Sequence, residues 1–187
     1  GFGFIEVGTV TPKQQLGNPK PRVFRLEKDQ ALINRLGFNN HGAETVSKRI
    51  SNNFPDGFLG INIGPNKETK NKENDYYICL SRLAKYAGYI TINISSPNTE
   101  GLRNFHDQEE MKKLLSGINK VIKEKKVGCP IAIKISPDIN DNEISRIVDL
   151  VNSYGIQGII VSNTTDSNRD DLLDIERHET GGLSGQP

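Results

Sequence analysis

The sequence predicts an α/β protein, and within that class a (β/α)8 TIM barrel of which about five β/α units are present. Short apolar, β-branched runs alternate with longer segments of helical spacing, and this alternation is typical of a parallel sheet with helical crossovers. Polar residues follow the end of each apolar run, where a barrel builds its site from many strands. A doubly wound open sheet, the competing architecture, would concentrate its ligand at one switch point instead.

The length and the first strand narrow the choice. A whole barrel takes roughly 250 residues, and this chain has 187, so we expect one domain over residues 1–187 that forms a partial barrel. The first strand leads into Gly8-Thr9-Val10-Thr11, which lacks the second and third glycines of a dinucleotide-binding fingerprint. The chain opens inside this strand and stops in a loop, and we expect both ends to be cuts.

The individual elements are expected in the following order. Strands are expected at residues 4–7, 58–63, 89–92, 130–135 and 158–161, because each run is apolar and rich in β-branched residues. Helices are expected at residues 43–50, 76–86 and 111–122 and from residue 141 onward, because apolar residues recur there at helical spacing. Asp141 is the expected N-cap of the last helix, with Glu143 in its first turn.

Three further features suggest function. The connection from Thr9 to Asn40 spans about 30 residues, far above the usual ~2–6, so it is either a solvated insertion or a segment folded over a site. Lys134 interrupts an apolar strand, and it either meets an electron-rich cofactor edge or extends to solvent. Residues 180–185 are rich in glycine and could bind phosphate through backbone N–H groups, although such loops are common.

Composition argues against several function classes. The formal net charge is +1 and no basic stripe with interleaved aromatic residues is present, so nucleic acid is not an expected partner. No apolar run reaches the length of a membrane span. Cys79 and Cys129 are expected to be free buried thiols in a reducing compartment. His41, His106 and His178 are isolated in polar segments, so we expect them at the surface or in loops, and we expect no metal site.

The loop from Asn93 to Thr99 is the strongest candidate for a site. It follows the apolar run at residues 89–92, and its Asn93, Asn98 and Thr99 side chains can both donate and accept hydrogen bonds. Ser96 stands before a proline, which biases its backbone towards an extended conformation. Such a loop can direct several neutral polar groups at one small ligand, although the same residues also form ordinary turns.

Taken together, the motifs resemble a known family. They are residues 8–12, 17–22, 33–40, 62–67 and 93–99, Lys134, and residues 162–165 and 180–185. Their combination and order, from end to end of the chain, closely resemble dihydroorotate dehydrogenase of the quinone-dependent, membrane-associated class 2. The resemblance implies a (β/α)8 barrel that binds FMN and oxidises (S)-dihydroorotate to orotate in de novo pyrimidine (UMP) biosynthesis, with a quinone as electron acceptor. It also implies that the family's first and last strands lie outside this chain, which alone is expected to be inactive.

The resemblance also implies roles for single residues. Ser96 corresponds to the base that removes the proton from C5 of the substrate, while Thr99 and Phe38 correspond to positions that shape a water path. The soluble class has cysteine in place of Ser96. The implied substrate contacts are Asn34, Arg35, Leu36, Gly37, Phe38, Asn93, Asn98, Asn163 and Thr164. The implied FMN contacts are Thr9, Asn62, Asn93, Lys134, Ser162 and Gly185, with serine at 162 where the family often has threonine.

Partners and location follow from the same resemblance. The expected partners are dihydroorotate or orotate, a quinone, and a membrane surface reached through an N-terminal segment outside this chain. The expected location is the bacterial inner membrane, on its cytoplasmic side, or the mitochondrial inner membrane, and a monomer is expected. Two alternatives remain open. The first is another FMN-barrel oxidoreductase acting on a pyrimidine, which a cysteine in place of Ser96 would have indicated. The second is a non-catalytic binding protein, which would have little need for Ser96, Asn98 and Lys134 together.

Overall fold

The computed structural model describes residues 2–98, 101–167 and 169–187, and its main element is a five-stranded parallel sheet. The sheet contains β1 (Phe4–Val10), β4 (Phe58–Ile63), β5 (Tyr89–Asn93), β6 (Ile131–Lys134) and β7 (Gly158–Ile160), in that spatial order. Every neighbouring pair is parallel. Each strand of the sheet therefore lies beside the next one along the chain, and all of the expected strands are confirmed within a few residues at their ends.

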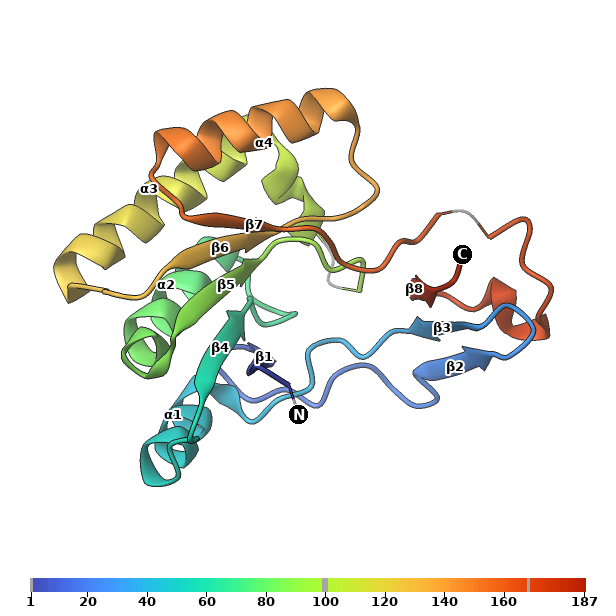
Figure 1. Cartoon of the computed structure of the whole chain (residues 1–187), viewed down its shortest axis with the longest axis horizontal. Coiled ribbons are helices and arrows are strands. Elements are labelled where there is room, and N and C mark those ends of the chain that lie inside the picture. The colour runs from blue at the N-terminus through green and yellow to red at the C-terminus, as the bar shows by residue number, and fades with distance from the viewer. Residues whose placement is uncertain (1, 99–100, 168) are drawn as a thin grey trace.

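The α-helices cover one face of this sheet (Figure 1). They are α1 (Gly42–Asn52), α2 (Lys72–Leu83), α3 (Gln108–Lys125) and α4 (Asp141–Ser153), with 3-10 turns η1 (Ala84–Tyr86), η2 (Leu102–His106) and η3 (Ile175–His178). Alternate strand residues such as Ile61, Ile90 and Ile133 are completely buried in the core shared with the helices. A doubly wound sheet has helices on both faces, so the one-sided cover agrees with a partial barrel.

The opposite face of the sheet carries the polar strand residues. On this face lie Glu6 of β1, Asn62 of β4, Thr91 and Asn93 of β5 and Lys134 of β6, which alternate along the strands with the apolar residues that face the helices. Aromatic rings occupy the amino-terminal ends of the same strands, where Phe58 stacks on Tyr89 with ring centroids 5.9 Å apart. The polar residues therefore gather towards the carboxyl ends, where barrel sites are built.

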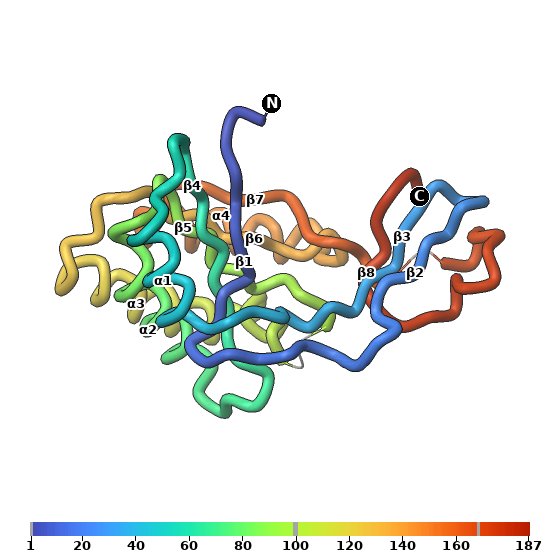
Figure 2. Tube along the Cα trace, turned by 90° about the horizontal axis from the view of Figure 1, so that it is seen from below, coloured from blue at the N-terminus to red at the C-terminus, as the bar shows by residue number. Residues whose placement is uncertain are grey.

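A second, antiparallel sheet stands apart from the first, on the side of the carboxyl ends of the parallel strands (Figures 1 and 2). It contains β2 (Val23–Leu26), β3 (Ala31–Asn34) and β8 (Gly182–Gly185), in the order β2-β3-β8. It has a small core of its own, made by Phe24, Leu26, Ile33, Leu172 and Leu183. The long connection after Thr9 was expected to be loop, and this was wrong, because it contains the β2–β3 hairpin. The glycine-rich segment also forms a strand, β8.

Two expectations about single residues were wrong. The N-cap of α4 is Asn140 rather than Asp141, because the Asn140 side chain accepts from the Glu143 N–H at 3.0 Å. Glu143 in turn accepts from the Asn140 N–H at 2.9 Å, which completes a capping box. His106 is buried rather than exposed, and its ring accepts a long contact from the Ser136 N–H at 3.5 Å. Polar residues Asp107 and Gln108 follow it in the chain, which is why the segment looked like surface.

The expectation that both cysteines are free thiols is confirmed. Cys79 and Cys129 are free thiols, the first buried and the second half-buried. Burial raises the pKa of the Cys79 thiol, so it stays protonated. No cluster of three or more potential metal ligands is present among the described residues. Within the same residues, no helix combines the length and the apolar character needed to cross a bilayer.

Candidate functional site

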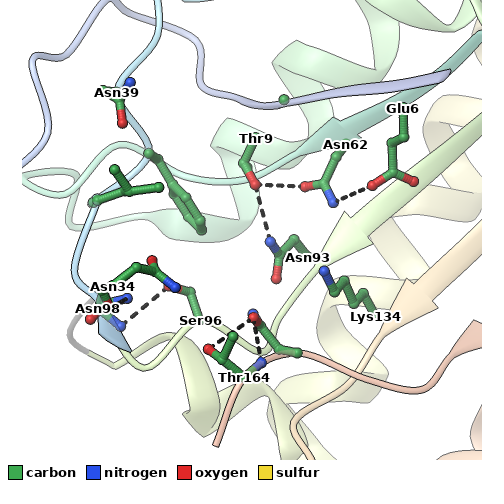
Figure 3. Close-up of a pocket in the computed structure, with 15 residues that line it drawn as sticks. Glu6, Thr9, Asn34, Asn39, Asn62, Asn93, Ser96, Asn98, Lys134 and Thr164 are labelled. Atoms are coloured by element: carbon green, nitrogen blue, oxygen red, sulfur yellow. Dashed lines mark hydrogen bonds between the residues drawn. The ribbon is translucent and has the colours of Figure 1, made fainter. Parts of the chain in front are cut away.

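A polar cavity of about 340 Å³ lies between the carboxyl ends of the parallel strands and the β2–β3 hairpin (Figure 3). It is lined by Glu6, Gly8, Thr9, Asn34, Leu36, Gly37, Phe38, Asn39, Asn62, Asn93, Ser96, Asn98, Lys134, Asn163 and Thr164. Most of the candidate residues from the sequence are therefore brought together in one place. Arg35, Ser162 and Gly185 are not among the lining residues, and Thr99 lies outside the described residues.

A series of side-chain hydrogen bonds forms the floor of the cavity. Asn62 donates to Glu6 at 2.9 Å, and the Thr9 hydroxyl donates to Asn62 at 2.7 Å. Asn93 donates to Thr9 at 3.1 Å (Figure 3). The backbone of Asn93 is also held by helix α2, because the buried Tyr76 hydroxyl donates to the Asn93 carbonyl at 2.6 Å. Strands β1, β4 and β5 are thus locked to one another at the site.

Ser96 lies at the wall of the cavity and is almost fully buried. Its hydroxyl oxygen accepts from the Asn98 N–H at 3.2 Å. The Asn98 side chain donates to the Asn34 carbonyl at 3.2 Å, which joins the Ser96 loop to strand β3. An N–H that points at a hydroxyl oxygen favours negative charge on that oxygen, so the contact suits a serine that gives up a proton.

The segment after β3 forms the roof of the cavity. Gly37 and Phe38 both have left-handed backbones, with φ of 72° and 53°. An aromatic residue with this conformation is uncommon and points to a constrained position. A methyl group at Gly64 would approach the Phe38 ring to 3.0 Å and the Thr9 methyl to 2.7 Å, so glycine leaves room for both. The long connection is therefore folded over the site rather than being a solvated insertion.

The Arg35 side chain points away from the cavity. Its guanidinium pairs with Glu179 at 2.6 Å and lies over the Phe24 ring at 4.4 Å from the centroid. Its carbonyl accepts from the Asn18 side chain at 2.9 Å. Arg35 therefore braces the small sheet, and any contribution to the cavity comes from its backbone and from the shape of the segment.

Ser162 and Gly185 line a second hollow of about 400 Å³ beside the first. The two hollows share Lys134, Asn163 and Thr164. Gly185 has φ of 130°, a conformation that other residues rarely adopt, and its backbone is exposed. The residues predicted to hold a cofactor thus extend from one hollow into the next.

Glu6 is a site residue that the sequence reasoning missed. It lines the cavity beside Lys134, and its carboxylate accepts from Asn62, from Tyr89 at 2.7 Å and from Thr91 at 2.8 Å. Burial raises the pKa of Glu6, but these hydrogen bonds and the charge of Lys134 outweigh that effect and leave the pKa below its ordinary value. Like Lys134, Glu6 is a charged residue inside an otherwise largely apolar strand. That pattern singled out Lys134 as a candidate and could have singled out Glu6 as well.

The family model for dihydroorotate dehydrogenase matches residues 1–187, which is the whole chain. The chain belongs to the dihydroorotate dehydrogenase family. Two similar curated proteins are named dihydroorotate dehydrogenase (quinone). The protein from Aliivibrio salmonicida is 49% identical over 195 residues, and the protein from Pseudoalteromonas atlantica is 50% identical over 193 residues. These alignments cover 100% and 99% of this chain but 57% of each relative, so the chain spans little more than half the length of these family members.

Solved structures of the family agree with the fold. A DHODH structure from Eimeria tenella, determined in complex with ferulenol, is 39% identical in sequence and superposes with a TM-score of 0.94. A ligand-free DHODH structure from the same organism gives the same TM-score at 40% identity. The chain is covered completely in both comparisons, against 57% and 58% of the two solved chains. The fold is therefore part of a dihydroorotate dehydrogenase α/β barrel.

The residues present fit the FMN that this family implies. A flavin mononucleotide has a polar-edged ring and a phosphate-bearing side chain, so it needs an elongated site, and the two adjoining hollows supply one. Thr9, Asn62 and Asn93 offer hydroxyl and amide groups on one side, and Lys134 offers a positive charge where the hollows meet. Gly185 lines the second hollow and is exposed, so a phosphate-bearing end can approach its backbone.

Proposed function

We propose that the full-length protein carrying this chain oxidises (S)-dihydroorotate to orotate, in de novo pyrimidine biosynthesis, with FMN as cofactor and a quinone as electron acceptor. The observation that carries the proposal is the position of Ser96, buried at a cavity whose lining also includes several asparagine amides and a lysine. Family membership over all 187 residues and relatives named for the quinone-dependent enzyme support the same conclusion.

Ser96 is proposed as the base that takes the proton from C5 of the substrate. A serine is a weak base by itself, so its hydroxyl proton must leave as the new proton arrives. The Asn98 N–H at 3.2 Å supports negative charge on the serine oxygen during this exchange. Among the described residues, no histidine or carboxylate is hydrogen-bonded to the Ser96 hydroxyl. We therefore propose that water carries the proton away, past Phe38.

Amide side chains are proposed to hold the pyrimidine ring. Asn34 from β3, Asn93 and Asn98 from the end of β5 and the loop after it, and Asn163 from the loop after β7 line the same cavity as Ser96, so a small flat ligand would meet them along several edges. Their positions are fixed before a ligand enters, because three of the four are bonded to other residues of the site. Thr164, Leu36 and Gly37, with the backbone of Arg35, are proposed to complete the substrate pocket.

Thr9, Asn62, Asn93, Lys134, Ser162 and Gly185 are proposed to hold FMN. When bound, FMN supplies the acceptor for the hydride that leaves C6 of the substrate. Lys134 is proposed to stabilise the negative charge that accompanies this transfer, because its ammonium stands at the junction of the two hollows. Glu6 lies on the same face of the sheet as Lys134, and the positive charge of Lys134 contributes to the lowered pKa of the Glu6 carboxyl. The electrons are then proposed to pass to a quinone at a bacterial or mitochondrial inner membrane, with the protein acting as a monomer.

Anaerobic mixing of the full-length protein with dihydroorotate tests this proposal. Flavin absorbance should fall rapidly in the wild type and should fall more slowly, by about 10²- to 10⁴-fold, in Ser96→Ala, because a positioned base contributes that much. Ser81→Ala is the control, since Ser81 is an exposed serine on α2. Equal rates in wild type and Ser96→Ala would keep the enzyme and discard Ser96 as its base. A flavin that does not respond to dihydroorotate would overturn the proposed reaction.

A further inference from the structure

The roof of the cavity, residues 36–39, is anchored at both ends by backbone hydrogen bonds. At its start, the Asn18 N–H donates to the carbonyl of the first roof residue at 3.0 Å. At its end, Gln15 and Asn40 exchange two backbone hydrogen bonds, of 3.1 and 3.0 Å. Among the described residues, no backbone N–H donates to the carbonyls of residues 37 and 38. The middle of the roof is therefore held by other groups.

Two side-chain amides bind these two carbonyls. Asn40 Nδ2 donates to the Phe38 carbonyl at 2.8 Å, and Gln15 Nε2 donates to the Gly37 carbonyl at 2.9 Å. Both carbonyls belong to residues with left-handed backbones, and this conformation persists in a phenylalanine only where the surroundings hold it. The roof therefore depends on the two amides for the shape that it presents to the cavity.

The Gln15 amide also reaches a second loop, the one that follows β4. Its Oε1 accepts from the Lys67 N–H at 3.1 Å, and it lies 2.9 Å from Asn66 Nδ2. The Lys67 N–H can only donate and the Gly37 carbonyl can only accept, so backbone groups at both ends fix the orientation of this amide. Gln15 thus forms a bridge between the loop after β4 and the middle of the roof.

The loop after β4 is a firm support for this bridge. The Asn66 N–H donates to the buried Asp75 carboxylate of α2 at 2.9 Å. The Gly64 N–H donates to the carbonyl of Val10, at the end of β1, at 3.0 Å. The loop is therefore tied to α2 and to β1, and it directly follows the strand that carries Asn62 of the cavity floor.

We infer that Gln15 is a positioning residue that fixes the roof relative to the floor of the cavity. Gln15 is not among the described residues that line the cavity, so it acts through Gly37 and Phe38 rather than by contact with a ligand. A flat ring bound between roof and floor requires a set separation between them, and the bridging amide maintains it. This inference rests on the proposed function, because that function places the pyrimidine against the roof.

Gln15→Glu in the full-length protein tests the inference. Glutamate keeps the shape and can still accept from the loop after β4, but an ionised carboxylate has no hydrogen to donate to the Gly37 carbonyl. We expect the Kd for orotate, titrated through the flavin absorbance, to rise about tenfold, as for a buried carbonyl that loses its partner. The Kd for FMN should stay within about threefold of wild type, because Gln15 bonds to none of the proposed FMN contacts. A general loss of structure would raise both values.

Gln14→Glu is the matched control. Gln14 is the neighbouring residue, it is exposed, and its substitution makes the same change in charge. Both Kd values should stay within about twofold of wild type in this variant. Gln15→Met removes the bridge without adding a charge and should raise the Kd for orotate as Gln15→Glu does. Equal Kd values for orotate in Gln15→Glu and Gln14→Glu would overturn the inference.

A double-mutant cycle with Phe38→Ala tests whether Gln15 acts through the roof. Once the Phe38 ring is absent, a displaced roof should matter less to a bound ligand. The double variant should therefore weaken orotate binding by less than the product of the two single effects. Independent effects, which multiply, would overturn the inference, because Gln15 would then act by a route other than the roof.

Hydrogen exchange of the ligand-free protein separates this outcome from that of the proposed function. The N–H groups of Asn18 and Asn40 are bonded across the two anchors of the roof, at 3.0 Å each, and should exchange about tenfold faster in Gln15→Glu than in Gln14→Glu. If the wild type neither binds orotate nor reacts with dihydroorotate, the proposed function fails, and these exchange rates alone decide on Gln15. Equal rates would overturn the inference. Where the wild type does bind orotate, faster exchange with an unchanged Kd for orotate would overturn it as well.

Discussion

Arg103 joins the loops that follow β5, β6 and β7, and its replacement should loosen the candidate site. Its two terminal nitrogens reach separate carboxylates, Asp138 and Asp166, each at 2.9 Å. Asp138 also accepts from the Ser167 hydroxyl at 3.0 Å. These loops carry Ser96 at one end and lead away from Asn163 and Thr164 at the other. A single guanidinium therefore fixes the loop that carries Ser96 relative to the loop that carries Asn163 and Thr164.

The expected cost follows from the exposure of the two ion pairs. The pair with Asp138 is the more protected, at 26% and 16% side-chain exposure, so its loss should cost about 1.5–2 kcal/mol. The pair with Asp166, whose side chain is 48% exposed, should add only about 0.5 kcal/mol. Arg103→Met should then lower the free energy of unfolding by about 2–2.5 kcal/mol. Lysine reaches one carboxylate but not both, so Arg103→Lys should lose about half as much.

Urea unfolding of the full-length protein, together with the Kd for orotate, measures both consequences. We expect Arg103→Met to weaken orotate binding as well as stability, and Arg103→Lys to recover part of each. Arg82→Met is the control, because the Arg82–Glu44 pair at 3.6 Å is exposed and far from the site, and it should change stability by less than about 0.5 kcal/mol. The reasoning fails if Arg103→Met is no worse than Arg82→Met, or if lysine behaves like methionine.

Two further predictions concern buried groups near the site. Tyr76→Phe removes the hydroxyl bonded to the Asn93 carbonyl at 2.6 Å, leaves that carbonyl short of a partner and should cost about 1–3 kcal/mol of unfolding free energy in urea. Burial holds the pKa of His106 below its ordinary value of 6.5, so the folded protein keeps the ring neutral where the unfolded chain would already be protonated. Its contribution to stability is therefore complete above about pH 6.5 and is lost as the pH falls below it. His106→Gln should remove that part of the pH dependence, and an unchanged profile would show that another group causes it.

The parallel sheet could be predicted because its signals are local. A run such as 89–92 is aromatic and β-branched, and apolar residues at helical spacing mark the segment 111–122 further along the chain. The small antiparallel sheet has no such signal. Its central strand, β3, pairs with β8 from the other end of the chain, with Ala31 opposite Gly185. A four-residue segment that contains two glycines does not look like a strand until its partner is known.

The composition of the site could be predicted for a related reason. Residues such as Ser96 and Lys134 stand out where they are, at the end of or inside an apolar run, and the carboxyl ends of parallel strands meet at one edge of the sheet. Arg35 shows the limit of this argument. Its neighbours Asn34 and Leu36 line the cavity, but the Arg35 side chain turns to Glu179, a residue 144 positions away that no local pattern connects to it.

The direction in which Asn93 and Asn163 present their side-chain amides is set within their own loops. An asparagine in a sequence offers a donor and an acceptor, and the expectation that Asn93 and Asn163 could serve either purpose was reasonable on that basis. In the folded chain both oxygens are taken, so the two amides retain donors alone. The donors include the N–H groups of Ser95 and Thr164, which are two residues and one residue away in the chain and can only donate. The partners of the amide nitrogens come from distant segments, since Asn93 donates to Thr9 and Asn163 donates to Ser95. Local turns therefore fix the direction of each amide, whereas contacts between distant segments fix its place in the cavity, and only the first of these is encoded within one segment of the sequence.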